Sequence, residues 1–120
     1  MTQASSLAQA GHDAPRCDAA LSLAFGLLGK RWNGIVLGVL SNGPLGFADL
    51  RRSIGAITDS MLSDRLAELA GAGLVARTVT DARPPGVSYE LTEAGRKLVP
   101  ILDQLAAWAG DNLARPSSTC

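Results

Sequence analysis

The sequence predicts an α+β fold that is mainly helical, and three observations carry this prediction. A stretch with helical periodicity is bounded by a capping residue, Thr58, and by glycines at positions 71 and 73. A shorter amphipathic helix precedes it by only a few residues, and two runs of alternating residues follow it, joined by a segment rich in proline. Helix, turn, helix and β-hairpin in this order are typical of a winged helix-turn-helix.

The length and composition suit one domain. The chain has 120 residues, of which 47% are hydrophobic, and few of these are aromatic. This share is ample for a core built from closely packed helices. We expect the domain to span residues 17–113, between disordered tails at 1–16 and 114–120.

Two helices are expected before the helix-turn-helix. Residues 18–28 are apolar nearly all round, which predicts burial on more than one side. The next helix shows the i, i+3, i+4, i+7, i+8 pattern of a buried amphipathic helix, and residues 41–44 then supply a stop. Its apolar stripe consists of Trp32, Ile35, Val36, Val39 and Leu40.

The first helix of the helix-turn-helix is short. Phe47, Leu50 and Ile54 define its apolar side, and residues 55–57 form a tight link to the next helix. Arg51 and Arg52 lie on its more polar sides, where we expect them to contact DNA phosphates. The alternative is that both only keep the surface soluble.

The second helix should be the recognition helix. Leu62, Leu66 and Leu69 fall on one side at helical spacing, so this side should pack on the core. The Thr58 hydroxyl can accept a hydrogen bond from a free backbone N–H of the first turn, and Gly73 can close the last turn.

The outward side of this helix carries small side chains that would let it enter the major groove. We expect Ser60, Ser63 and Asp64, together with Thr58, to contact DNA. Serine can bind phosphates or base edges, and aspartate can accept a hydrogen bond from a cytosine amino group. Asp64 is equally well explained as a solvated acid that repels DNA. Arg65 falls beside the leucine stripe and should pair with Asp49 or Glu68.

Two strands are expected at 75–80 and 87–91, and the loop between them should be the tip of a two-stranded wing. Arg77 lies on the first strand, and Arg83 lies in the tip, where it is free to reach a phosphate or the minor groove, so we expect both to contact DNA. The alternative for Arg83 is an ordinary loop arginine.

The last helix begins after Thr92, and its apolar face continues to Leu113, with a kink or a restart expected at Pro100. A long apolar face at each end of a small chain predicts dimerisation through the N- and C-terminal helices. The alternative is that these two helices pack on each other within a monomer. The residues expected at the dimer interface are Leu21, Phe25, Leu102, Leu105 and Trp108.

The net charge of the chain does not by itself predict a nucleic-acid partner. The chain has eleven basic and eleven acidic residues, so its formal net charge is zero. The arginines can still lie along one face, and a dimer presents each of them twice. We therefore expect DNA binding that weakens steeply as salt rises.

The cysteines do not form a disulfide framework, and no segment resembles an export signal or a membrane span, so we expect a cytoplasmic protein. Cys17 directly precedes a helix, where the helix dipole and Arg16 would favour a reactive thiolate. A small buried hydrophobic role is the alternative for Cys17. His12 is the only histidine, so no metal site is expected, and no glycine-rich loop suggests a cofactor.

Several motifs stand in a characteristic order: GKRW at 29–32, FADLRR at 47–52, ITDSML at 57–62, AGLV at 72–75, PP at 84–85 and VSYELT at 87–92, with Cys17, Gly95 and Trp108. With these motifs, the whole arrangement resembles the HxlR-type winged helix-turn-helix family of bacterial transcription regulators, relatives of the MarR group. The resemblance implies a cytoplasmic homodimer that binds operator DNA and responds to a metabolite, a reactive electrophile or an oxidant. In some members of that family, a cysteine near the position of Cys17 is the sensor.

The chain departs from the family pattern in ways that should weaken its electrostatic hold on DNA. Several members carry basic or amide residues where this chain has Leu45, Gly46, Ser60, Asp64 and Ala67. We expect a regulator without enzymatic activity that binds an inverted-repeat operator. An alternative function is a winged helix that has lost specific DNA binding and binds other proteins. A thiol enzyme centred on Cys17 is a further alternative, although no base lies close to it in the sequence.

Overall fold

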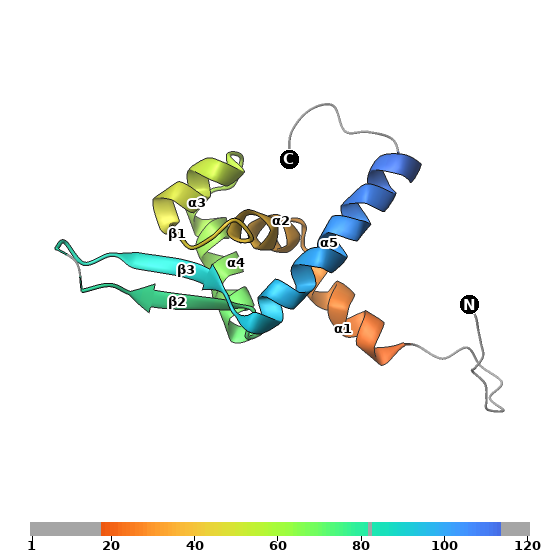
Figure 1. Cartoon of the computed structure of the whole chain (residues 1–120), viewed down its shortest axis with the longest axis horizontal. Helices are drawn as coiled ribbons and strands as arrows, with labels where there is room; N and C mark the ends of the chain where they lie inside the picture. The colour runs from red at the N-terminus through yellow and green to blue at the C-terminus, as the bar shows by residue number, and fades with distance from the viewer. Residues whose placement is uncertain (1–17, 82, 114–120) are drawn as a thin grey trace.

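The computed structural model describes residues 18–81 and 83–113, and it confirms the α+β, mainly helical fold. Cys17, Cys120, His12 and the two expected tails lie outside the described residues. Figure 1 shows the wing at one end of the molecule and helices α1 and α5 at the other. The elements in chain order are α1 (Ala19–Leu28), α2 (Arg31–Leu40), β1 (Leu45–Gly46), α3 (Phe47–Ile54), α4 (Asp59–Gly71), β2 (Val75–Val79), β3 (Val87–Leu91) and α5 (Glu93–Asn112).

The core forms around α2, which packs against α3, α4, α5 and β3. The predicted stripe of α4 is buried, as are Leu50 and Ile54 of α3 and Val36 and Leu40 of α2, while Phe47 of α3 is partly buried and packs against this core. Leu37 is also buried, although it does not belong to the predicted stripe, because α2 is covered on more than one side. Ile57, in the turn between α3 and α4, is buried as well. The buried hydrophobic residues are Val36, Leu37, Leu40, Leu50, Ile54, Ile57, Leu62, Leu66, Leu69, Val75 and Leu91.

Helix α4 begins and ends where the sequence predicts. The Thr58 hydroxyl accepts a hydrogen bond from the Met61 N–H at 3.1 Å. At the other end Gly73 takes a φ of +80°, a conformation that side chains disfavour. The Leu74 N–H then donates to the Leu69 carbonyl and the Gly73 N–H to the Ala70 carbonyl, each at 3.0 Å, which closes the helix in a Schellman motif.

The sheet has three strands in the order β1-β3-β2, so the wing hairpin is joined by a strand that was not predicted. Strand β1 has two residues, Leu45 and Gly46, which pair antiparallel with Tyr89 and Ser88. A two-residue strand carries no periodicity of its own. It forms because the chain leaving α2 runs alongside β3, and this pairing anchors the wing to the start of α3.

Helix α5 is continuous through Pro100, so of the two predicted outcomes, a kink or a restart, the restart is wrong. Proline removes one backbone donor, but Leu98, Val99 and Leu102 pack against the core on both sides of it and hold the helix together. Within the described residues, no single helix meets the length and hydropathy of a bilayer span, although α1 and α2 reach it as a pair bent by 81°.

Candidate nucleic-acid interface

Helices α3 and α4 form the helix-turn-helix, and an ion pair joins them across the turn. Arg51 Nε lies 2.9 Å from Asp59 Oδ1, so the last turn of α3 is bonded to the first residue of α4. Gly55 has a φ of +90°, which lets the chain reverse sharply after α3. Ile57 is buried in the core, and this anchors the turn from below.

The N-terminal half of α4 presents the outward face that the sequence predicts. Ser60, Ser63 and Asp64 are all exposed, and Ala67 continues the same small-residue surface. Thr58 is exposed as well, but its hydroxyl oxygen already accepts the capping bond of α4. A narrow polar surface of this kind fits the major groove without steric obstruction.

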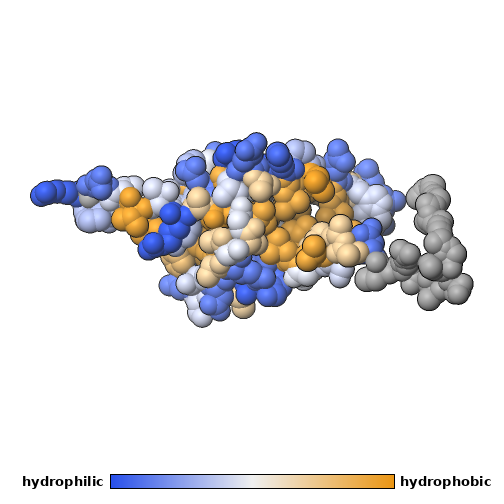
Figure 2. All heavy atoms as spheres, turned by 90° about the horizontal axis from the view of Figure 1, so that it is seen from below, coloured by the Kyte–Doolittle hydropathy of each residue, from blue (hydrophilic) through white to orange (hydrophobic). Residues whose placement is uncertain are grey.

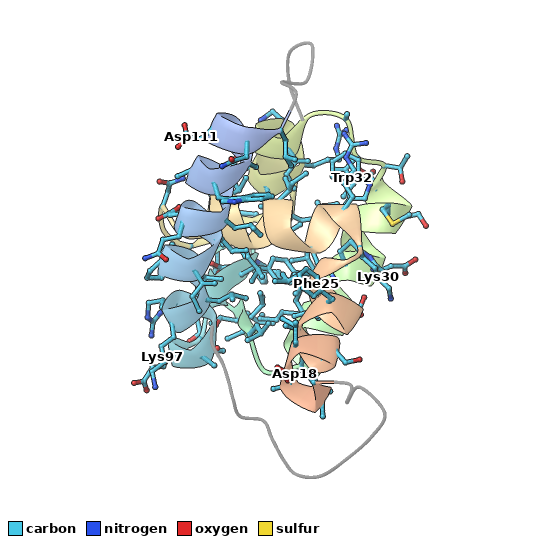
Figure 3. All side chains as sticks on the ribbon, turned by 90° about the vertical axis from the view of Figure 1, so that its right-hand side faces the viewer. Asp18, Phe25, Lys30, Trp32, Lys97 and Asp111 are labelled. Atoms are coloured by element: carbon cyan, nitrogen blue, oxygen red, sulfur yellow. The ribbon has the colours of Figure 1, made fainter. Side chains whose placement is uncertain are left out.

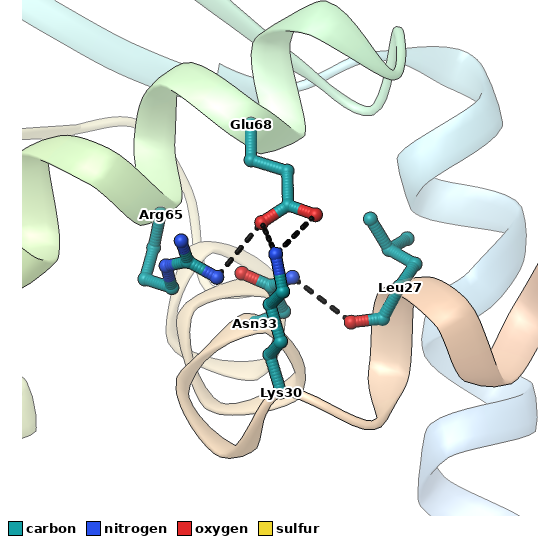
Figure 4. A network of polar contacts seen from close by, with 5 residues as sticks. All are labelled: Leu27, Lys30, Asn33, Arg65 and Glu68. Atoms are coloured by element: carbon teal, nitrogen blue, oxygen red, sulfur yellow. Dashed lines mark hydrogen bonds and ion pairs between the residues drawn. The ribbon is translucent and has the colours of Figure 1, made fainter.

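A polar network holds the C-terminal half of α4, on the flank next to its outward face, to the N-terminal part of the chain (Figure 4). Lys30 Nζ donates to both carboxylate oxygens of Glu68, at 3.1 and 3.2 Å. Arg65 Nη1 donates to Glu68 Oε1 at 2.8 Å, which confirms the predicted pairing of Arg65 with Glu68. Asn33 is fully buried, and its Nδ2 donates to the Leu27 carbonyl at 2.9 Å.

The network favours the ionised form of Glu68. The hydrogen bond from Lys30 lowers the pKa of Glu68, and Asn33 and the charge of Arg65 act in the same direction. Partial burial acts against them, yet the pKa of Glu68 stays below its ordinary value of 4.5. Glu68 is therefore a carboxylate at neutral pH and can hold two cations at once.

Arg51 and Arg52, which were expected to contact phosphates, are exposed but both pair with acids. Arg51 binds Asp59, and Arg52 binds Asp49 one turn earlier on α3. A phosphate must compete with these carboxylates for either guanidinium. Both pairs are largely exposed, so the exchange of one partner for another costs little.

The two arginines of the wing, unlike Arg51 and Arg52, have no acidic partner among the described residues. Arg77 lies on β2 opposite Tyr89 of β3, and Arg83 lies in the loop beyond the strands. Both are exposed, and neither forms an ion pair with any of the residues that the structure describes. The wing is closed by two bonds between Thr80 and Gly86, at 2.8 and 3.1 Å.

The expected dimer surface lies at the end of the molecule away from the wing. No residue of α1 is buried, so the burial on more than one side predicted for residues 18–28 is not found within the described chain. The exposed fraction is 57% for Phe25 and 54% for Trp108. Leu21 and Leu105 are exposed too, whereas Leu102 packs against the core. Figure 2 shows apolar side chains gathered on this half of one face, and Figure 3 looks directly onto α1 and α5.

Sequence reasoning missed the contributions of Lys30 and Asn33. Asn33 stands as a polar residue inside the otherwise apolar stripe of α2, and this interruption was the available signal. Lys30 carries no such signal, because its partner Glu68 lies 38 residues further along the chain.

Comparisons with known proteins agree with this geometry. Residues 27–117 match the model of the HxlR-like helix-turn-helix family. The HTH-type transcriptional regulator YodB of Bacillus subtilis is 42% identical over 96 residues, which cover 80% of this chain and 85% of YodB.

Solved structures show the same fold. The reduced form of YodB has a TM-score of 0.75 at 38% identity, covering 86% of this chain and 100% of that one. The redox regulator HypR in its oxidized form has a TM-score of 0.73 at 35% identity, covering 80% and 99% of the two chains. The family match spans the helix-turn-helix, the wing and α5, and this chain accordingly belongs to the HxlR family of helix-turn-helix transcriptional regulators.

Proposed function

We propose that the chain acts as a cytoplasmic homodimer that binds an inverted-repeat operator and regulates transcription from it. One observation carries the proposal: the wing, whose arginines form no ion pair with the described residues, lies at one end, the exposed apolar face of α1 and α5 lies at the other, and α4 lies between them with its N-terminal half exposed. This separation lets two copies join through α1 and α5 while both recognition helices remain free. Half-sites about one turn of DNA apart, roughly 34 Å, suit such a dimer.

The operator is the first thing to measure. Fluorescence anisotropy against duplexes tiled across the DNA next to the gene should find one inverted repeat that resists competition by random duplex. Replacing Arg77 and Arg83 with alanine should weaken this binding. The fall of log K with log salt should also become less steep, by about two in slope for each arginine, because a dimer presents each one twice.

Lys97→Ala is the matched control, since Lys97 is an exposed cation on α5. Equal, weak binding to every duplex would contradict the proposal. It would favour instead a winged helix that binds proteins. The aspartates paired with Arg51 and Arg52 agree with that function, because they neutralise arginines that would otherwise attract DNA phosphates.

The dimer can be tested separately. The wild-type chain should sediment as a dimer, and Phe25→Asp or Leu105→Asp should shift it to monomer, because a charge in an apolar interface remains unpaired. Val79→Asp removes an equally exposed apolar side chain from β2 and should leave the dimer intact. A wild-type monomer would refute this part of the proposal.

We propose that the signal is an oxidant or an electrophile acting on Cys17, with a bound metabolite as the other candidate effector. Support comes from the relatives, since the solved structures include the reduced form of YodB and the oxidized form of the redox regulator HypR. Treating the protein with diamide should change the affinity for the operator, and Cys17→Ser should abolish the change. Cys120→Ser is the control, and a full response in Cys17→Ser would rule out Cys17.

A further inference from the structure

The recognition helix lacks the side chains that usually read purines. Guanine is read mainly by bidentate arginine or lysine, and adenine by asparagine or glutamine. Helix α4 contains no lysine, asparagine or glutamine. Its one arginine, Arg65, has a side chain only 14% exposed and bonded to Glu68. Any base contacts from α4 must therefore be made by side chains other than arginine, lysine, asparagine and glutamine.

One large apolar side chain is exposed on this helix. Most of the large hydrophobic residues exposed in the described part of the chain belong to α1 and α5, at the proposed dimer face. Met61 is 40% exposed, belongs to α4 and is absent from the residues packed on the core. Its exposed part is thus available to a partner of the recognition helix.

The position of Met61 is well defined. It is the third residue of α4, and its backbone N–H is bonded to the Thr58 hydroxyl, which holds the first turn of the helix in place. Residues near the N-terminus of a recognition helix are those that contact base edges. Asp64 lies one turn further on the same side, because residues three apart are neighbours on a helix surface.

The major groove offers one apolar group to such a side chain, the C5-methyl group of thymine. A methionine thioether is flexible and polarizable, so it can follow the surface of that methyl group. Asp64 is an acceptor without a positive partner in the described residues, and the cytosine amino group is the donor that suits it. Apolar and acidic side chains one turn apart thus match adjacent pyrimidines.

We infer that Met61 is a specificity-determining residue that contacts the methyl group of a thymine in each half-site. The inference rests on the proposed operator binding and goes beyond it, because it names the base and the chemical group. Asp64 accepts a hydrogen bond from a cytosine close to that thymine. The half-site is thereby distinguished by a thymine and a nearby cytosine that α4 contacts in the major groove.

Replacing single thymines with deoxyuridine tests this directly, because the change removes one methyl group and no hydrogen-bonding atom. Each thymine of the operator is replaced in turn, in both half-sites, and anisotropy is measured with wild type, Met61→Ala and Met61→Leu. At one position the wild type should lose about fourfold in affinity per half-site, the factor expected for one methyl group removed from an apolar contact. Met61→Ala should bind the thymine operator less tightly and show no further loss with deoxyuridine at that position.

Met61→Leu keeps an apolar side chain and should retain most of the sensitivity. Val79→Ala, on the wing, is the control and should respond to deoxyuridine as the wild type does. If Met61→Ala lost as much affinity as the wild type at every deoxyuridine position, the effects of the two changes would be additive. That result would overturn the assignment of Met61 while leaving operator binding established. A wild-type protein that selects no duplex would overturn this inference together with the proposed function.

Discussion

Lys30 and Glu68 connect the link between α1 and α2 to the recognition helix α4. Lys30 lies in the link between α1 and α2, and its ammonium group binds both carboxylate oxygens of Glu68 on α4. Asn33, one turn further along α2, binds the carbonyl of Leu27 in α1. The end of α1 and the recognition helix are therefore positioned by the same short stretch of chain.

Glu68→Gln should destabilise the protein at neutral pH and reduce the dependence of its stability on acid. The folded-state pKa of Glu68 is lowered, so its stabilising effect is complete above about pH 4.5 and disappears as the pH falls through the folded-state value. Thermal unfolding of wild type and variant from pH 7 to about pH 3 should show melting temperatures that converge at the acid end. Glu90→Gln, in an exposed position of β3, is the control. A constant difference between Glu68→Gln and wild type would contradict the ion-pair explanation.

Gly95→Ala should destabilise the fold by about 1–3 kcal/mol, as expected for an overpacked site. A Cβ at Gly95 would lie 2.3 Å from the Leu74 carbonyl oxygen, a backbone atom that cannot rotate away. Gly110 lies in the same helix with nothing within 4 Å of its Cβ position, so Gly110→Ala should stabilise by up to about 1 kcal/mol. Chemical denaturation of both variants measures the difference, and equal stabilities would show that α5 does not approach Leu74 closely.

Asp49→Asn should raise the affinity for DNA by about two- to fivefold. The change releases Arg52 from its carboxylate partner and removes a negative charge from the surface beside the helix-turn-helix. The size follows from the usual strength of an exposed ion pair. Anisotropy at several salt concentrations measures the effect, with Asp103→Asn on α5 as the control. Unchanged affinity would mean that Arg52 stays away from the phosphates.

Thr58→Ala should lower the stability by about 1 kcal/mol, the usual cost of removing an N-cap hydroxyl. Thr58→Ser keeps the oxygen that accepts the Met61 N–H and should restore most of the stability. Comparing the unfolding free energies of the two variants with their operator affinities separates capping from contact with DNA. Loss of affinity in Thr58→Ala without loss of stability would assign Thr58 mainly to DNA.

The order of the main helices and of the hairpin could be predicted because their signals are local. Thr58 and Gly73 mark the ends of α4 within one turn of the helix, and Leu62, Leu66 and Leu69 repeat at its period. The alternation of β2 and β3 likewise depends only on neighbouring residues. The exposed face of α4 follows from the same periodicity, so Ser60 and Asp64 were placed correctly without tertiary information.

Tertiary structure alone decided which distant residues meet. Strand β1 exists only because Leu45 and Gly46 pair with β3, more than forty residues along the chain. The acids that hold Arg51 and Lys30 were not predicted, because a charged side chain finds its partner through the packing of whole helices. The sequence by itself determined the helices, the hairpin and their inward faces, since backbone capping and hydrophobic periodicity act within a few residues. The ion pairs and the continuity of α5 through Pro100 depended on the assembled core, since packing from several elements outweighs any single local preference.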